Sequence, residues 1–357
     1  MGALILQGSP TNSMETLVEA DNSSVSRDTE LSALKSSVSY DFTCCRQFAG
    51  HKNYITSGVF SPRGTTVLTG SRDKTARLWE TKTGQQLHIL EEHLGDITSA
   101  KFSTDGASVV SGACDNIACL CDVKTGQRLH ILAGHTDDVT SVAFSPDETT
   151  VLTGSADHTA RLFDVNTGKQ LHILEGHTKA VTSVAYSPDG TAVLTGAYDK
   201  TARIWEVKTG QQLGILEEQH PIYCVAYSPD GTTVITGSKD CTARGWDVKT
   251  QQLVQEFKGH TQGITSVAYS PDGTTVLTGS LDKTARLWDV KTGTQLHILK
   301  EHSYTVTSVA YSPDGNSILT CSGETARLWT VAKESSVLGF TQPINLDDDS
   351  QKECSIQ

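Results

Sequence analysis

The stretch GHTQGITSVAYSPDGTTVLTGSLDKTARLWDVKTGTQLHIL, from Gly259 to Leu299, decides the fold because the chain repeats it. Its SPDG tetrapeptide, or a close relative, begins at seven serines: Ser61, Ser103, Ser145, Ser187, Ser228, Ser270 and Ser312. Successive starts are 42 residues apart, except for the 41 between Ser187 and Ser228. A fixed period of this length indicates a domain built from stacked copies of one structural unit.

Each unit contains four short segments that favour β-strands. ITSVAYS and TTVLTG are rich in β-branched residues and flank the PDG turn. TARLWDV follows a tight turn at LDK, and TQLHIL follows the turn KTG. Four strands in each of seven units predict an all-β fold, a seven-bladed β-propeller of four-stranded antiparallel blades.

From about Tyr40 to Val331 the sequence resembles the WD-repeat propeller family. The resemblance rests on Gly-His before the first strand of a unit, Asp before the third strand, and Trp-Asp or a relative at its end. It implies that a His, a Ser or Thr, an Asp and a Trp form one structural hydrogen-bond network in each blade. The residues carried over are His51, Thr69, Asp73 and Trp79 in blade one, His177, Thr195, Asp199 and Trp205 in blade four, and His260, Thr278, Asp282 and Trp288 in blade six.

One segment raises the question of catalysis, because TGSADHTARLFD places Ser155, Asp157 and His158 within four positions. These are the residue types of a nucleophilic triad. Counterparts of Asp157 recur in five other blades, however, whereas a catalytic site is usually built once. We therefore expect Asp157 to be a structural residue, with Phe163 in the place of tryptophan and with the partners His135 and Thr153.

Three blades depart from the pattern. Blade two has Cys121 where Trp is expected, and blade five is one residue short, so that His220 is not expected to fill the histidine position. Blade seven reads CSGETA, has lost one residue and shows no clear Asp at the turn. Lost hydrogen bonds and lost tryptophan packing predict that these blades are softer than the others.

The first strand of the chain is expected to close the ring. DFTCCRQF precedes the first unit and supplies one outer strand, whereas the last unit supplies only three strands. We therefore expect 42–48 to pair with 325–331, which removes exposed sheet edges. The predicted organisation is a disordered N-terminal tail over 1–39, one propeller over 40–331 and a flexible acidic C-terminal tail over 332–357.

Composition narrows the class of function. The net charge of −12 argues against nucleic-acid binding, since there is no basic surplus to displace counterions. Nine cysteines without a secretory signal indicate reduced thiols in a cytoplasmic protein, with the nucleus as the other compartment. No transmembrane segment and no cofactor motif is predicted. The final CSIQ matches a prenylation box at Cys354, which would give weak membrane attachment at most.

The expected function is a non-catalytic scaffold or adaptor that presents a rigid face to one or more proteins or peptides, as a monomeric propeller within a larger complex. In the WD-repeat family the face that carries the His and Asp loops usually binds partners. Positions that vary there while the frame stays constant predict a binding site that uses Tyr54, Arg72, Tyr198, Tyr223 and Lys239.

Two other classes of function remain open. One is an enzyme with its site in the central channel, which would need a polar constellation confined to one blade. The other is a substrate receptor of a cullin-type ubiquitin ligase, because WDVK at 246–249 and at 288–291 resembles a docking motif, with Lys249 and Lys291 at its last position. The close cysteines Cys114, Cys119 and Cys121 lack the spacing of a zinc site, so we expect buried thiols.

Overall fold

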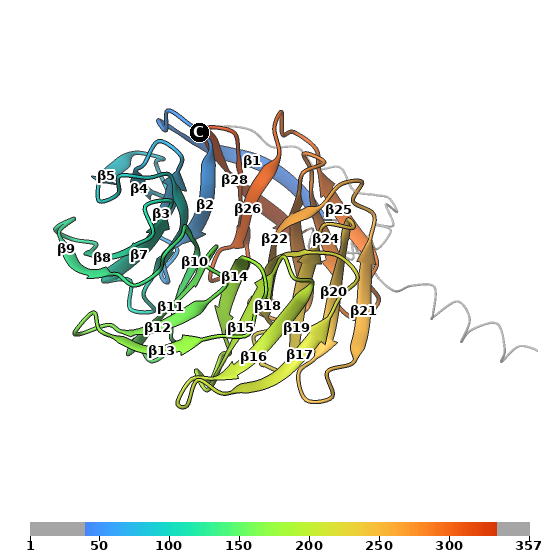
Figure 1. Cartoon of the computed structure of the whole chain (residues 1–357). Coiled ribbons are helices and arrows are strands. Elements are labelled where there is room, and N and C mark those ends of the chain that lie inside the picture. Colours follow the sequence, from blue (N-terminus) through green and yellow to red (C-terminus); the bar gives the residue numbers. More distant parts are fainter. Residues whose placement is uncertain (1–39, 334–357) are drawn as a thin grey trace, which may run out of the picture. The chain divides into compact units, whose positions relative to one another are not determined.

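The computed structural model describes residues 40–333, which form one compact unit of strands arranged as a ring of seven sheets (Figure 1). Each sheet has four antiparallel strands, and six of the seven run in simple sequence order from the inner to the outer strand. The predicted seven-bladed propeller is therefore confirmed. The two tails proposed for 1–39 and 332–357, and Cys354 with them, lie outside the described residues, apart from 332 and 333.

The strands fall into four classes by their place in the blade. The inner strands are β2 (Ile55–Phe60), β6 (Ile97–Phe102), β10 (Val139–Phe144), β14 (Val181–Tyr186), β18 (Ile222–Tyr227), β22 (Ile264–Tyr269) and β26 (Val306–Tyr311). The second strands are β3 (Thr66–Ser71), β7 (Ser108–Ala113), β11 (Thr150–Ser155), β15 (Ala192–Ala197), β19 (Thr233–Ser238), β23 (Thr275–Ser280) and β27 (Ser317–Ser322). The third strands are β4 (Ala76–Glu80), β8 (Ala118–Asp122), β12 (Ala160–Asp164), β16 (Thr201–Glu206), β20 (Thr242–Asp247), β24 (Ala285–Asp289) and β28 (Thr325–Lys333). The outer strands are β5 (Gln86–Leu90), β9 (Arg128–Leu132), β13 (Gln170–Leu174), β17 (Gln212–Glu217), β21 (Leu253–Lys258), β25 (Gln295–Leu299) and β1 (Tyr40–Ala49).

Blade seven joins the two ends of the described chain. Its strand order is β1-β28-β27-β26, and β1 pairs antiparallel with β28 (Figure 1). Phe42 lies opposite Val331 and Phe48 lies opposite Ala326, with a bulge between Cys44 and Arg46. The predicted closure of the ring is therefore confirmed.

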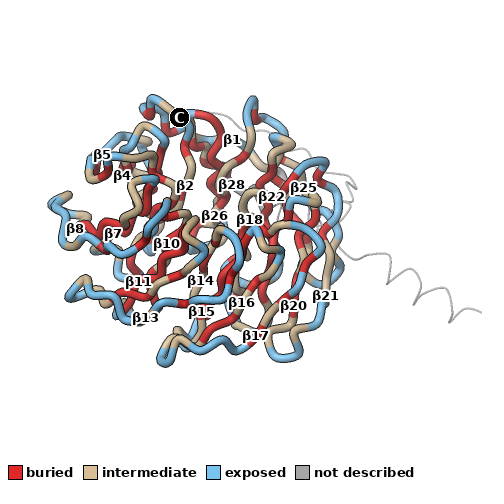
Figure 2. The backbone as a smooth tube through the Cα atoms, viewed as in Figure 1, coloured by how far each residue is buried: buried red, intermediate tan, exposed pale blue. Residues whose placement is uncertain are grey.

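The core lies between neighbouring blades. Residues of the second strands are buried on both faces because each sheet is covered by a sheet on either side, as at β11, where all six residues are buried (Figure 2). One cluster joins Leu152 and Leu174 of blade three to Val193 and Trp205 of blade four. The outer strands are largely exposed, because nothing in the described chain covers them.

Threonine and serine side chains tie the inner strands into a belt. Thr140 Oγ1 donates a hydrogen bond to Val181 O at 2.6 Å, and Ser141 Oγ accepts one from Val184 N at 3.2 Å. The same pair of bonds occurs at six of the seven junctions between described blades. The exception is the junction between blades five and six, where Tyr223 and Cys224 replace Thr and Ser.

Candidate functional site

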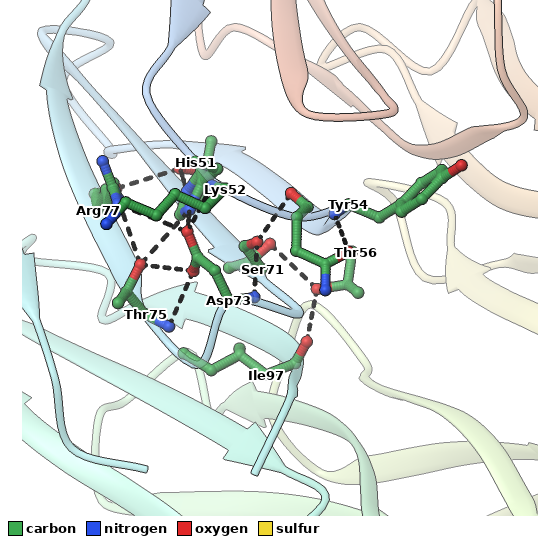
Figure 3. Close-up of polar contacts among 12 residues, drawn as sticks. His51, Lys52, Tyr54, Thr56, Ser71, Asp73, Thr75, Arg77 and Ile97 are labelled. Carbon is green, nitrogen blue, oxygen red and sulfur yellow. Dashed lines mark hydrogen bonds and ion pairs between the residues drawn. The ribbon is translucent and has the colours of Figure 1, made fainter. Parts of the chain in front are cut away.

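Each regular blade holds a chain of buried hydrogen bonds between its loops and its third strand. In blade one, His51 Nδ1 lies 2.8 Å from Asp73 Oδ2 (Figure 3). Its Nε2 lies 2.8 Å from Thr69 Oγ1. Trp79 Nε1 donates to the same threonine oxygen at 2.8 Å. Because a carboxylate only accepts, Nδ1 of His51 carries the proton and Nε2 accepts from the threonine hydroxyl.

Blades four and six repeat this geometry. In blade four, the His177–Asp199 bond is 2.9 Å, the His177–Thr195 bond is 2.7 Å and the Trp205–Thr195 bond is 2.9 Å. In blade six, the corresponding bonds of His260 to Asp282, of His260 to Thr278 and of Trp288 to Thr278 are 2.8, 2.7 and 2.8 Å. The residues carried over from the family resemblance thus lie in contact in all three blades.

The triad-like segment of blade three has the same arrangement. His135 lies 2.8 Å from Asp157 and 2.7 Å from Thr153. Burial favours the neutral carboxyl, but hydrogen bonds from Thr159 and His135 outweigh it and lower the pKa of Asp157 to about 2. The Ser155 hydroxyl donates to Asp137 O and accepts from the Asp157 backbone, so it does not face a histidine. This segment holds a turn in place and does not form a nucleophile–base pair.

Blade five fills the histidine position with a carboxylate. His220 is half exposed and its Nδ1 lies 3.9 Å from Asp240. Glu218 instead accepts a hydrogen bond from the Thr236 hydroxyl and another from Arg244 Nη1 at 2.7 Å. Arg244 also binds Asp240 at 2.6 Å. Glu218 was not predicted from the sequence. Its position two residues before the displaced His220 could have indicated that it takes the place of the histidine.

Blades two and seven keep only part of the pattern. In blade two, His93 lies 2.9 Å from Ser111, and the small buried thiol of Cys121 occupies the tryptophan position. Cys119 is also buried, but Cys114 is exposed, so the prediction of three buried thiols was wrong for Cys114, which lies in a surface turn. In blade seven His302 is buried without an aspartate.

Tyr223 lies in β18 and lines the central channel. The other four predicted partner-binding residues lie in loops and turns on one face of the ring, here called the loop face. It is formed by the loops that enter the inner strands and by the turns between the second and third strands. Tyr54 and Tyr304 meet there edge to face, with ring centroids 5.6 Å apart, and the Arg72 guanidinium lies 6.0 Å from the Tyr54 ring. Figure 3 shows Tyr54 pointing away from the His51 network. Tyr304 was missed because it stands one position earlier in its loop than Tyr54.

A second aromatic pair lies at blades four and five. Tyr198 and Tyr223 have ring centroids 5.7 Å apart at an interplanar angle of 88°. Lys239 is exposed in the neighbouring turn, and both Tyr223 and Lys239 border Gly263. Together with Tyr304, the five predicted residues form two clusters: the Tyr54–Tyr304 pair with Arg72, and the Tyr198–Tyr223 pair with Lys239 in the neighbouring turn. Leu94, 86% exposed on the same face, was also missed.

The central channel is a cavity of about 800 Å³ lined by the seven inner strands. Lys101 is the one charged residue among the residues that line it, where the neighbouring blades have Val59 and Ala143. The Lys101 side chain is exposed to the channel. Lys249 and Lys291 are exposed in turns after β20 and β24, at the opposite end of these strands from the loop face.

Comparison with known proteins identifies the fold family. The WD domain, G-beta repeat family matches seven segments: 42–80, 84–122, 126–164, 168–206, 210–247, 251–289 and 293–330. The chain therefore belongs to the WD-repeat proteins, whose propellers typically serve as protein-interaction scaffolds. It is also similar to the zebrafish (Danio rerio) protein "Dynein assembly factor with WD repeat domains 1", with 36% identity over 52 residues. That similarity covers 15% of this chain and only 12% of the zebrafish protein.

Within residues 40–333, no helix is long and apolar enough to cross a membrane. The eight cysteines of this part of the chain are all unpaired.

Proposed function

We propose that this protein is a non-catalytic scaffold that binds other proteins through the loop face of its propeller. The observation that carries the proposal is the pair of aromatic clusters, Tyr54–Tyr304 with Arg72 and Tyr198–Tyr223 with Lys239. Tyrosine and arginine are favoured anchors of protein interfaces because they combine a large apolar area with a polar group.

The rigidity of the ring supports this function. The loop that carries Tyr54 and the turn that carries Tyr198 belong to blades one and four, where the buried hydrogen-bond network and the belt between the inner strands are complete. A face that is already ordered loses little conformational entropy on binding. The 52-residue similarity to the zebrafish protein spans little more than one repeat, so we do not base a partner on it.

The test is an affinity pull-down from native cell extract with quantitative mass spectrometry. The variant changes Tyr54, Tyr198 and Tyr223 to alanine. The matched control changes Leu129, Leu171 and Leu213, three large exposed side chains that lie on outer strands, to alanine. We expect a partner that is retained by the wild type and the control and lost by the tyrosine variant. Equal recovery by all three folded proteins would contradict the proposed face.

The channel offers a separate test of catalysis. Apart from Lys101, the residues that line it are uncharged, and no histidine or carboxylate lines it. The lining also holds the Cys224 thiol and five tyrosine hydroxyls, among them that of Tyr186. Burial raises the pKa values of Cys224 and Tyr186, which keeps both groups protonated and disfavours them as nucleophile or base, in support of a scaffold. Binding of a ligase adaptor that is lost when Lys249 and Lys291 are changed to alanine would instead identify a ubiquitin-ligase substrate receptor.

We place the protein in a reducing compartment, the cytoplasm or the nucleus. Support comes from the unpaired thiols, including the exposed Cys45 and Cys114. Prenylation of Cys354 remains a prediction, and mass spectrometry of the native C-terminus tests it.

A further inference from the structure

Blade six shows how a regular blade holds its turn aspartate. Asp282 Oδ2 accepts hydrogen bonds from His260 Nδ1 at 2.8 Å and from Thr261 N at 3.0 Å. Its Oδ1 accepts from Thr284 N at 3.0 Å and from Thr284 Oγ1 at 2.6 Å. Arg286 Nη2 lies 3.9 Å from Oδ2. The carboxylate is therefore surrounded by donors from two loops and one strand.

Blade seven keeps these donor residues and lacks the aspartate. His302, Ser303, Thr325 and Arg327 are the counterparts of the four residues that hold Asp282. His302 is 6% exposed, and neither of its ring nitrogens has a hydrogen-bond partner within the described residues. Its ring still packs edge-on against Trp329, at 5.8 Å between centroids, so it stays inside the blade. The Nε atom of Arg327 is also buried without a partner.

A cavity lies beside the shortened turn of blade seven; His302 is not one of its lining residues, but the next residue, Ser303, is. It measures about 280 Å³, and Ser303, Thr325 and Arg327 contribute to its walls. The pair formed by Tyr54 and Tyr304 lines the same cavity and connects it to the loop face. The short turn needs a glycine, because Gly323 adopts a φ of +59° and packs against the Tyr304 ring, where a Cβ would come within 2.7 Å of Cδ2.

We propose that this blade-seven cavity is a carboxylate-binding site that receives an aspartate or glutamate side chain from a protein partner, which thereby completes the network of the blade. The inference rests on the proposed function, since it assigns the chemistry of one contact on the loop face. A carboxylate is the group that the same donor set holds in the other blades. A buried histidine without a partner is costly, and a carboxylate would give His302 the acceptor that His260 has in Asp282.

The chain does not fill the site from its own turn. Glu324 lines the cavity, but it is exposed and makes no ion pair with His302 or Arg327 in the described structure. With one residue fewer than in blade six, the turn from Ser322 to Thr325 holds only two residues. Its glutamate therefore starts from a different backbone position than Asp282.

The first experiment uses the full-length protein and a small probe, N-acetyl-aspartate methylamide, with N-acetyl-asparagine methylamide and inorganic phosphate as comparators. The ring nitrogens of His302 are followed by NMR after ¹⁵N-histidine labelling, and the signal is assigned with His302→Gln. We expect the aspartate probe to shift the His302 signal saturably and to raise its titration midpoint. The asparagine probe should bind at least tenfold more weakly, because it lacks the charge.

Two arginine variants separate this site from general anion binding. Arg327→Gln should weaken the aspartate probe by about tenfold or more. Arg286→Gln is the matched control, because its site in blade six is already filled by Asp282, and it should leave the affinity unchanged. Asp282→Gly should create a second carboxylate site in blade six, seen as a probe-dependent shift of the His260 signal. If this variant does not fold, the comparison of Arg327→Gln with Arg286→Gln still tests the proposal.

Three results would overturn the proposal: no saturable effect of the aspartate probe on His302, tighter binding of phosphate, or equal losses in the two arginine variants. A fourth result would also overturn it: Glu324→Gln, without any probe, changes the His302 signal as much as the loss of a bound carboxylate would. The chain would then fill its own site. None of these measurements needs a partner protein. The carboxylate site can therefore be contradicted while the pull-down supports the scaffold, and the scaffold can be contradicted while the site is confirmed.

Discussion

The threonine of the repeat makes different hydrogen bonds in blades six and three, although its surroundings are otherwise alike. Thr278 Oγ1 lies between Trp288 Nε1 and His260 Nε2, at 2.8 and 2.7 Å. Thr153 keeps the bond to His135 but has no tryptophan donor, because Phe163 replaces the tryptophan. The two threonines therefore separate the contribution of the tryptophan bond from that of the histidine bond.

Replacing each threonine with valine keeps its shape and removes the hydroxyl. Thr278→Val leaves two buried polar groups without a partner, whereas Thr153→Val leaves one. We expect Thr278→Val to lower the free energy of unfolding by about 1–3 kcal/mol more than Thr153→Val does. Denaturant unfolding of the two variants measures this difference. Equal losses would show that the tryptophan bond adds no stability.

A second prediction concerns the residue after the turn aspartate, which adopts a left-handed conformation. Lys283 has a φ of +68°, which costs a side chain about 1–2 kcal/mol. Lys283→Gly should raise the free energy of unfolding by about 1 kcal/mol, after the entropy cost of glycine is deducted. Lys283→Ala is the control and should give no gain, because it keeps the Cβ. A loss on Lys283→Gly would contradict the expected strain.

At the scale of one element, β20 carries the arginine on which blade five depends. Arg244 lies 2.7 Å from Glu218, 2.6 Å from Asp240 and 3.3 Å from Glu256. Burial raises the pKa of Glu218, against the hydrogen bond from Thr236 and the nearby arginine charge. Without Arg244 this buried carboxylate would face Asp240 uncompensated.

Arg244→Met should therefore cost about 3–5 kcal/mol of unfolding free energy, as is typical when one partner of a buried ion pair is removed. Lys258→Met breaks the exposed contact with Glu256 and should cost about 0–1 kcal/mol. Adding Glu218→Gln to Arg244→Met should recover part of the loss, since no buried charge then remains. A small loss in Arg244→Met, matching Lys258→Met, would mean that water reaches the cluster.

The inner strands allow a test of the expectation that the irregular blades are softer. β18 lacks the Thr and Ser bonds that join the other inner strands to the next blade. We expect its amides to exchange hydrogen faster than those of β14, which keeps both bonds. Native-state hydrogen exchange by mass spectrometry compares the two strands. Equal protection would show that backbone pairing alone sets their stability.

For the molecule as a whole, the buried histidines and aspartates predict that the free energy of unfolding falls in acid. Burial and the nearby Arg327 charge lower the pKa of His302 from 6.5 to about 4, so the unfolded chain binds this proton first. Stability should fall by up to about 3 kcal/mol as the pH drops through that window. The pKa of Asp282 is lowered from 3.8 to about 2, which extends the loss below pH 3.8.

The measurement is the free energy of unfolding as a function of pH for the wild type and His302→Gln. The variant should show a shallower slope between pH 6.5 and 4. Some slope should remain, because burial also lowers the pKa values of His51, His135 and His260. Identical slopes would show that His302 is hydrated in solution.

The fold was predictable because its determinants are local and repeated seven times. Counting strands also predicted the pairing of β1 with β28. The surface was harder to predict, because loop length decides where a side chain points. The short turn at Gly323 brings Tyr304 against Tyr54, and the shortened loop of blade five puts Glu218 in place of a histidine. Residue types at equivalent positions do not reveal such shifts.

The pairing of β1 with β28 also means that the ring can close only late in biosynthesis. β1 ends at Ala49 and β28 begins at Thr325, a difference of 325 − 49 = 276 positions. At translation rates of about 5–20 residues per second, the first strand waits for its partner for tens of seconds. During that time the growing sheets have open edges on the ribosome. The open sheet edges of the earlier units are therefore covered only after the last unit has been synthesised.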